Sequence, residues 1–240
     1  MVTNDTPIGK IEQIGGVECY VATPSKEYSN NKVILFLPDA FGITLPNAQV
    51  HPDLAYHSLT GSRPVMPDYF NGDAVPIDAL EPGRTFDFAG WLPNHSSAHT
   101  RPSLDRVIAT LKESGVTEFG ATGYCFGGRY VFDLAFEDVL KVAVVSHPSL
   151  LKFPDDFEKY ATVVKAPLLV NSCTIDQMSP KEIHEKTDEL FVNFSPGYRR
   201  EYWDGCTHGF AIRGDLSDPK VKAGKEGAFK AAAQWLLSHL

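Results

Sequence analysis

The chain alternates between short continuous apolar runs and longer stretches in which apolar residues recur every three or four positions. Short apolar runs bounded by turn residues are typical of strands buried in a parallel sheet. Five such strands are predicted, at residues 33–37, 64–66, 119–123, 142–146 and 168–171. An opening strand pair is predicted around residues 10–23, and a last strand near residues 199–203.

Helical periodicity appears between several of these runs. Residues 103–113 and 130–136 have apolar side chains at a spacing close to 3.6 residues, which predicts crossover helices. Strands that alternate with helices predict an α/β fold with a mostly parallel central sheet and helices on both faces. No repeat or linker-like segment interrupts the series, so residues 1–240 are predicted to form a single domain. A last helix is expected to place one apolar face on the sheet, formed by Phe229, Ala232, Trp235, Leu236 and Leu240.

Composition and charge narrow the classes of function. With 240 residues, 43% apolar and 22% charged, the chain has the composition of an ordinary globular protein. Its net charge of −8 and the lack of a Lys/Arg cluster argue against a nucleic-acid partner. Apolar runs far shorter than the roughly 20 residues that cross a bilayer argue against a membrane protein. Because the first residues have no basic end and no apolar stretch, a cytoplasmic location is expected.

The four cysteines, Cys19, Cys125, Cys173 and Cys206, lie far apart and form no CxxC pair. In a reducing compartment they are expected to be free thiols. Cys125, Cys173 and Cys206 could in principle join His208 in a zinc site, but the close ligand pairs of structural zinc sites are missing. The sequence therefore predicts neither a metal nor another cofactor, and Cys125 needs a different chemical explanation.

Cys125 lies between a predicted strand and a predicted helix, in the segment GYCFG of residues 123–127. This is the G-x-S-x-G nucleophile turn with sulfur in place of oxygen. Glycines two residues to either side prevent side chains from colliding across a tight turn, whose middle residue has a strained backbone. The turn would expose the sulfur above the sheet at a helix N-terminus, where the helix dipole favours the thiolate. A structural thiol beside glycines that shape the helix start is the alternative interpretation.

Two backbone amides are expected to stabilise the negative oxygen that forms when a carbonyl is attacked. The Phe126 N–H directly follows the nucleophile and is the first candidate. The second candidate lies in the loop after the strand at residues 33–37, where either the Ala40 or the Phe41 N–H could donate.

A nucleophile on such a turn needs a base and an acid that orients the base, and both are expected after it in the chain, the acid first. Asp176 directly follows a predicted strand and is the preferred acid. Asp188, in a helical stretch, and Asp204, beside a strand, are interpreted as ordinary surface charges.

His208 is the preferred base among the eight histidines. It lies in a loop after the last predicted strand, with glycines close by that allow its ring to reach the sulfur. His147, at another strand end, is the main competitor, but it precedes Asp176 and would break the expected order.

Four phrases give the chain a resemblance to the dienelactone hydrolase family of the α/β-hydrolase superfamily, particularly to its eukaryotic members. They are PDAFGI at residues 38–43, MPDYFNGD at 66–73, GYCFGGRY at 123–130 and HGFAIRG at 208–214. The resemblance extends over nearly the whole chain and implies an α/β-hydrolase fold. It also implies a triad of Cys125, Asp176 and His208 that hydrolyses a lactone or ester without metal or cofactor.

Substrate-binding residues follow from the same resemblance. In the bacterial pattern a glutamate holds the resting thiol, and the matching position here is Asp39, which is one methylene shorter. Family members that act on dienelactone hold its carboxylate with arginines. Arg213, five residues after His208, is an offset counterpart of one of them, and Arg84 or Arg101 is a weaker candidate for a second. A solvated surface charge is the alternative for each.

These residues predict a hydrolase of lactones or small esters that forms a thioester on Cys125, acting as a monomer or weak homodimer. Two other classes of function stay open. One is a catalytically silent protein that binds a small acid or a protein partner in the same pocket. The other is a peroxide sensor in which Cys206 would resolve oxidised Cys125.

Overall fold

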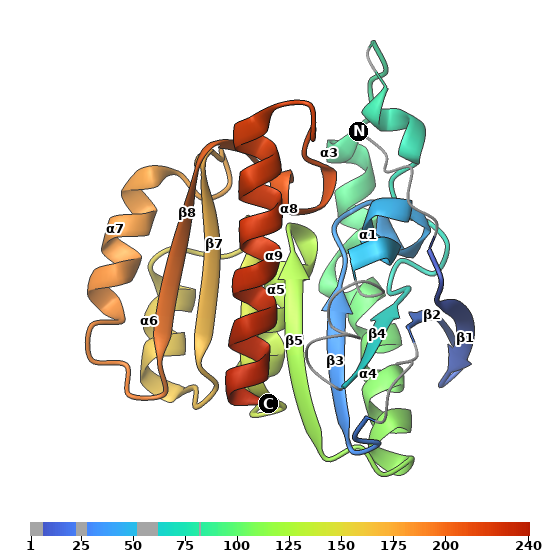
Figure 1. Cartoon of the computed structure of the whole chain (residues 1–240). Helices are drawn as coiled ribbons and strands as arrows, with labels where there is room; N and C mark the ends of the chain where they lie inside the picture. Colours follow the sequence, from blue (N-terminus) through green and yellow to red (C-terminus); the bar gives the residue numbers. More distant parts are fainter. Residues whose placement is uncertain (1–6, 23–27, 52–61, 82) are drawn as a thin grey trace.

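The computed structural model describes residues 7–22, 28–51, 62–81 and 83–240 (Figure 1). Eight strands form one sheet in the order β1-β2-β4-β3-β5-β6-β7-β8. Neighbours from β4 onward are parallel, whereas β1 and β2 are antiparallel to their neighbours at one edge. The strands are β1 (Lys10–Ile14), β2 (Val17–Val21), β3 (Lys32–Leu37), β4 (Arg63–Pro67), β5 (Glu118–Tyr124), β6 (Leu140–Ser146), β7 (Leu168–Ile175) and β8 (Tyr198–Thr207).

Helices connect most of the strands and surround the sheet. The α-helices are α1 (Pro46–His51), α3 (Phe88–Trp91), α4 (Ser97–Glu113), α5 (Phe126–Phe136), α6 (Asp155–Val163), α7 (Lys181–Leu190), α8 (Phe210–Arg213) and α9 (Pro219–His239). Short 3-10 turns add η1 (Gly42–Thr44), η3 (Ile77–Leu80) and η4 (Leu92–His95). Within the described residues, none of these helices is long and apolar enough to span a membrane.

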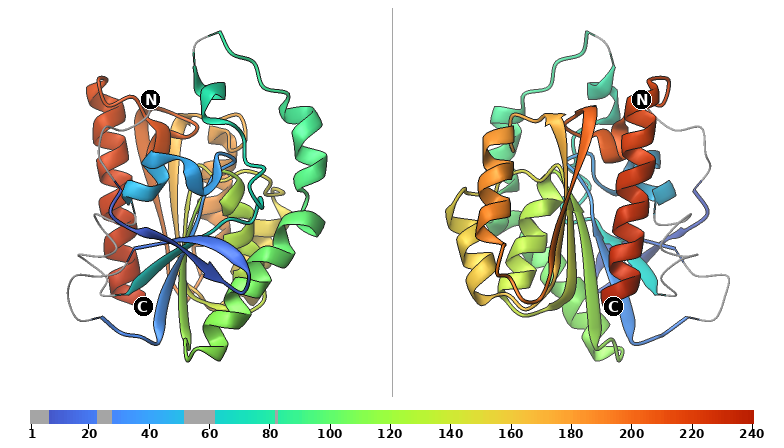
Figure 2. Two further views of the ribbon diagram at one scale, coloured as in Figure 1. Left: turned by 90° about the vertical axis from the view of Figure 1, so that its right-hand side faces the viewer. Right: turned by 60° about the vertical axis from the view of Figure 1, so that its left-hand side comes forward.

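The sheet separates two apolar cores, because successive side chains of a strand point to opposite faces. In β3, Leu35 packs into one core and Phe36 into the other, and both are fully buried. The helices α4, α5 and α6 contribute to the first core, and α1, α8 and α9 to the second. Figure 2 shows α9 and the pair α4 and α5 on opposite sides of the sheet. The predicted α/β-hydrolase fold, with a mostly parallel sheet covered on both faces, is confirmed.

Helix starts are where the expectations from sequence differ most from the structure. The helix predicted from residue 103 begins at Ser97 and continues through Pro102. The Ser96 carbonyl accepts hydrogen bonds from the His99 and Thr100 amides, which starts the helix upstream of the proline. Similarly, α5 begins at Phe126, directly after the cysteine, rather than at residue 130.

The parallel strands place four sequence-distant positions at the same edge of the sheet. Asp39 follows β3, Cys125 follows β5, Asp176 follows β7 and His208 follows β8. Since parallel strands all end at one edge, the folding of the sheet alone brings these residues to a common surface.

Two glycines allow β5, α5 and β3 to approach closely at that edge. A Cβ atom on Gly127 would lie 2.1 Å from the Leu37 carbonyl oxygen, and one on Gly123 would lie 2.6 Å from the Gly127 carbonyl oxygen. Both obstacles are backbone atoms, which cannot rotate away as a side chain can. Glycine is therefore required at residues 123 and 127 because any side chain there would collide with backbone atoms.

Gly127→Ala should destabilise the fold more than Gly115→Ala. The first substitution drives a methyl group into the backbone of β3, an overpacking that costs about 3 kcal/mol or more. The second adds a methyl group in open space, where only its φ of +100° resists it, at a cost of about 1–2 kcal/mol. Urea unfolding of both variants measures the difference, and equal losses would show that the close contact with Leu37 is unimportant.

Candidate active site

Cys125 has the strained backbone that a nucleophile turn requires. Its φ of 49° and ψ of −112° place it in a region that side-chain-bearing residues rarely adopt, directly before the first residue of α5. The Cys125 N–H donates to the Ser146 carbonyl at 3.2 Å, and its carbonyl accepts from the Gly128 and Ser149 amides at 3.0 and 2.9 Å. These bonds hold the strained residue from both sides while its thiol stays partly exposed.

His208 lies between Asp176 and Cys125. Its ring Nδ1 donates to Oδ1 of Asp176 at 2.9 Å. The backbone N–H of His208 donates to the Ile175 carbonyl, also at 2.9 Å. Oδ1 of the buried Asp176 also accepts from the Met178 amide at 2.9 Å. The Met178 amide thus holds the Asp176 carboxylate, and the carboxylate orients one side of the His208 ring.

The electrostatic surroundings of His208 connect it to the cysteine. Burial lowers the pKa of His208, but hydrogen bonds to Asp176 and to Cys125 raise it, and the result is about 9. A charged imidazole is stabilised because two partners that can carry negative charge lie on either side of it. The structure therefore joins Asp176 to His208 by a hydrogen bond, and Cys125 is close enough to His208 to raise its pKa.

The competing acids are engaged elsewhere. Asp188 forms an ion pair with Arg200 and accepts a hydrogen bond from Tyr198 at 2.8 Å. Asp204 is an exposed residue that pairs with Lys220 at 2.7 Å. Neither of these pairs involves His208.

His147, the competing base, lies directly against His208. Their ring centroids are 5.0 Å apart in an edge-to-face arrangement, and His147 also packs on Phe210. Burial, followed by the nearby charges of His208 and Arg213, lowers the pKa of His147 well below its ordinary value. Within the described residues neither ring nitrogen has a hydrogen-bond partner. His147 is therefore a neutral ring that supports the imidazole of His208.

The expected oxyanion donors occupy the loop and helix start beside the sulfur. The Phe126 N–H belongs to the first turn of α5, where an intrahelical acceptor is lacking. The Phe41 N–H donates to Oδ1 of Asp39 at 3.0 Å, so it is already engaged. Because this bond occupies the Phe41 amide, Ala40 is the stronger of the two candidates in that loop.

Asp39 and Arg213 contact each other. The Arg213 Nε donates to Oδ2 of the fully buried Asp39 at 2.7 Å, and the guanidinium lies 4.9 Å from the centre of the Phe41 ring. The pair joins the loop after β3 to α8, the helix that follows His208. By contrast, Arg84 pairs at the surface with Asp78 and Glu81.

Ser149 is a neighbour of the nucleophile that the sequence did not single out. Its Oγ lies 3.4 Å from the Cys125 Sγ, and its side chain is buried. Its position could have been noticed in the sequence. Ser149 follows the end of β6, the strand next to β5, in the same short segment as His147. A hydroxyl at this distance can donate a hydrogen bond to a thiolate.

The other cysteines are buried thiols. Burial raises the pKa of Cys19 and of Cys173 to about 12. Cys206 packs in the core under α9, where its sulfur lies against Gly224, whereas Cys125 packs against the core on the α5 side. The two sulfurs thus belong to different faces of the sheet. In the described ranges, no three His, Cys, Asp or Glu side chains are grouped so that they could hold a metal ion.

Comparison with known families agrees with this geometry. Residues 17–240 match the model of the dienelactone hydrolase family. The chain belongs to the dienelactone hydrolase family. This membership confirms the resemblance seen in the sequence and the expectation of a hydrolase that acts on esters or lactones.

Fungal members of the dienelactone hydrolase family are among the similar curated proteins. Dienlactone hydrolase 1 of Gibberella moniliformis is 31% identical over 96% of this chain and 87% of its own length. Hydrolase pyvD of Aspergillus violaceofuscus is 30% identical over 97% of this chain and 91% of its own. A crystal structure of a putative dienelactone hydrolase from Klebsiella pneumoniae superposes with a TM-score of 0.70 at 16% identity, covering 97% and 99% of the two chains. That likeness supports the fold.

His208→Gln should cost more stability in acid than in alkali. The raised pKa means that charged His208 stabilises the fold fully below its unfolded value near 6.5, and that this contribution is lost as the pH rises through about 9. The gap in unfolding free energy between wild type and variant should therefore shrink, by up to about 3 kcal/mol, from about pH 6 to about pH 10.

Urea titrations at the two pH values measure this gap. The control is His99→Gln, which removes an exposed histidine of α4 and should leave the gap close to zero at both pH values. A gap for His208→Gln that is constant, or larger in alkali, would show that the charged form is not the one the fold stabilises.

Proposed function

We propose that the protein hydrolyses small carboxylic esters or lactones by nucleophilic catalysis, with Cys125 as nucleophile, His208 as acid and base, and Asp176 as the group that orients His208. The observation that carries this proposal is the position of His208, whose ring is held by Asp176 and interacts with Cys125 at the carboxyl edge of the sheet. Its raised pKa keeps the imidazole of His208 protonated at neutral pH.

The first half-reaction opens the ester. The Cys125 thiolate attacks the carbonyl carbon, and the oxygen that becomes negative accepts hydrogen bonds from the Phe126 and Ala40 amides. As the carbon–oxygen bond breaks, the imidazolium of His208 transfers its proton to the departing alkoxide or enolate. The products of this step are a thioester on Cys125 and a neutral His208; from a lactone, both parts remain joined in one chain.

The second half-reaction restores the enzyme. Neutral His208 takes a proton from a water molecule as the water oxygen attacks the thioester carbonyl. The tetrahedral intermediate then collapses and expels the Cys125 thiolate, which leaves the acid product and regenerates the imidazolium. The sum of both steps is one water consumed for each ester bond cleaved.

Two neighbouring groups have supporting roles in this proposal. Ser149 donates a hydrogen bond to the thiolate and so holds the sulfur in place between turnovers. Asp39, paired with Arg213, holds the Phe41 amide and thereby fixes the backbone that presents Ala40. The proposal gives Arg84 no role, because carboxylates already surround it at the surface.

Cys125→Ala should lower kcat/KM for p-nitrophenyl acetate by at least about a thousandfold, because it removes the atom that forms the acyl-enzyme. Cys125→Ser should retain weak activity, since the turn and the amide donors remain. Cys206→Ala removes a buried thiol away from the turn and serves as the matched control, with activity close to wild type. Circular dichroism checks that all three variants fold.

Acid quenching of wild-type enzyme during turnover tests the intermediate itself. The acetyl group should be found by mass spectrometry on the peptide that contains Cys125. Turnover by Cys125→Ala at the wild-type rate, or a label on another residue, would remove Cys125 from the mechanism.

A further inference from the structure

A cavity of about 380 Å³ lies between α5, α3, η4 and the start of α4. Its wall includes Phe126, the residue after Cys125, and Leu150, the residue after Ser149. Cys125 and Ser149, whose Sγ and Oγ atoms lie 3.4 Å apart, are thus the chain neighbours of two residues of this wall. A volume of this size is within the range of pockets that bind small molecules.

The polar groups in the cavity wall are occupied by other parts of the protein. The Tyr130 hydroxyl is bonded to Thr100. The two ring nitrogens of His95 contact the Trp91 carbonyl at 2.8 Å and Asp73 at 3.2 Å. The polar atoms of these rings are therefore paired within the protein, and the surface that lines the cavity is predominantly apolar.

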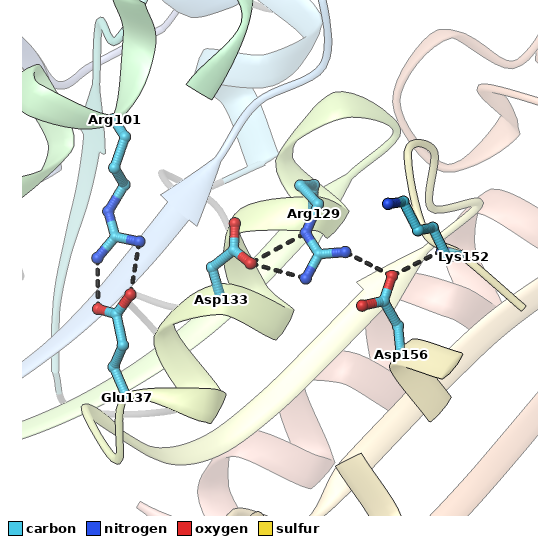
Figure 3. Close-up of polar contacts among 6 residues, drawn as sticks. All are labelled: Arg101, Arg129, Asp133, Glu137, Lys152 and Asp156. Atoms are coloured by element: carbon cyan, nitrogen blue, oxygen red, sulfur yellow. Dashed lines mark hydrogen bonds and ion pairs between the residues drawn. The ribbon is translucent and has the colours of Figure 1, made fainter. Parts of the chain in front are cut away.

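Arg129 is the one cationic side chain among the residues that line this cavity in the described structure, and two carboxylates neutralise it. It contacts Asp133 at 2.7 Å and Asp156 at 2.5 Å, and Asp156 also accepts from the Lys152 amide (Figure 3). All three charged side chains are mostly buried, so solvent screens them little. One guanidinium facing two carboxylates leaves an excess of negative charge, which repels an anion.

The other arginines considered as carboxylate binders are neutralised in the same way. Arg213 pairs with Asp39, and Arg101 pairs with Asp105. Figure 3 shows the second ion pair of Arg101, with Glu137. Arg84 pairs with two acidic residues at the surface. A substrate carboxylate would have to displace an existing ion pair at any of them, which costs the energy of that pair.

Two large apolar side chains are exposed in or next to the cavity wall. Leu92 of η4 lines the cavity and is 39% exposed, and Phe88 of α3, which directly precedes the lining residue Ala89, is 49% exposed. Neighbouring exposed apolar side chains at a concave site are typical of surfaces that bind a ligand. Beneath them Phe126 packs in an aromatic cluster with Phe70 and Tyr130, at ring distances of 5.0 and 5.7 Å.

We infer that this cavity binds an uncharged aromatic ring of the substrate, and that the enzyme selects neutral aryl esters or aromatic lactones against substrates that carry a free carboxylate. The inference rests on the proposed function, whose nucleophile directly precedes Phe126 of the cavity wall. Ring faces recognise the substrate through stacking and burial, while the carboxylates around Arg129 reject anions.

Binding of two matched products tests the inference without relying on turnover. Calorimetry compares 2-naphthol with 6-hydroxy-2-naphthoate, which has the same rings and an added carboxylate. Wild type should bind the naphthol at least about tenfold more tightly, a difference of about 1.4 kcal/mol. Equal affinities, or tighter binding of the naphthoate, would overturn the inference.

Ala89→Phe tests the location of the ring. Ala89 is an exposed residue of α3 that lines the cavity, so a phenylalanine there fills the space without disturbing the core. It should weaken naphthol binding at least about tenfold and raise KM for 2-naphthyl acetate, while hydrolysis of the small ester vinyl acetate continues. Ala109→Phe, at an exposed position of α4 outside the cavity, is the matched control and should change neither. Undiminished naphthol binding by Ala89→Phe would contradict this location.

Asp133→Asn tests the charge argument. The substitution leaves Arg129 facing one carboxylate, so the affinity for 6-hydroxy-2-naphthoate should rise severalfold while the affinity for 2-naphthol stays the same. An unchanged affinity for the naphthoate would contradict the electrostatic part of the inference.

The two proposals fail in different ways. Naphthol binding that Ala89→Phe abolishes, in a protein that hydrolyses no ester, supports the cavity and overturns the proposed catalysis. Ester hydrolysis that depends on Cys125, in a protein that binds naphthol and naphthoate equally, leaves the catalysis standing and overturns the selection of neutral rings.

Discussion

The strained turn at Cys125 is the constraint on which the rest of the site depends. A residue with a φ of 49° and a ψ of −112° costs about 1–3 kcal/mol, and it persists only if its surroundings fix it. Here β6 accepts a hydrogen bond from its amide, while α5 and the segment after β6 donate to its carbonyl. The same bonds that hold the strain also place Ser149 beside the sulfur, so the turn and its chemical neighbourhood form together.

Parallel strands then supply the partners of the sulfur from distant parts of the sequence. Asp176 comes from the end of β7 and His208 from the end of β8, two strands that are neighbours in the sheet. Their side chains need no long loops to meet, because His208 is fixed through its own amide to Ile175 at the end of β7. Buried His147 fills the space behind the imidazole, which restricts the ring without adding a charge.

Patterns among neighbouring residues predicted the fold, and they located the turn at Cys125. The apolar runs identified β3, β5 and β6, and the glycines around Cys125 identified the turn, since both depend on adjacent residues. The helix starts at Ser97 and Phe126 were less visible, because the capping carbonyl of Ser96 and the compatibility of Pro102 with the helix depend on backbone geometry.

Contacts between distant segments could not be read from the sequence in the same way. Asp39 and Arg213 were each identified as candidates, but their pairing across 174 positions depends on the packing of α8 against the loop after β3. Likewise, the cavity beside Phe126 exists only because η4 and α5 pack together, and no spacing along the chain marks it. The sequence therefore identified single residues at the edge of the sheet, such as Asp176 and His208, better than it identified surfaces that form between distant segments.

The rate of Cys125 alkylation by iodoacetamide near neutral pH tests most directly whether His208 activates the sulfur. Cys125 is the one partly exposed cysteine of the four, so peptide mapping follows it without interference from the buried thiols. The account predicts alkylation at least about tenfold faster than that of a model thiol, and a loss of this advantage in His208→Gln, because a neighbouring imidazolium favours the reactive thiolate. A wild-type rate equal to that of the model thiol, or unchanged in the variant, would contradict it.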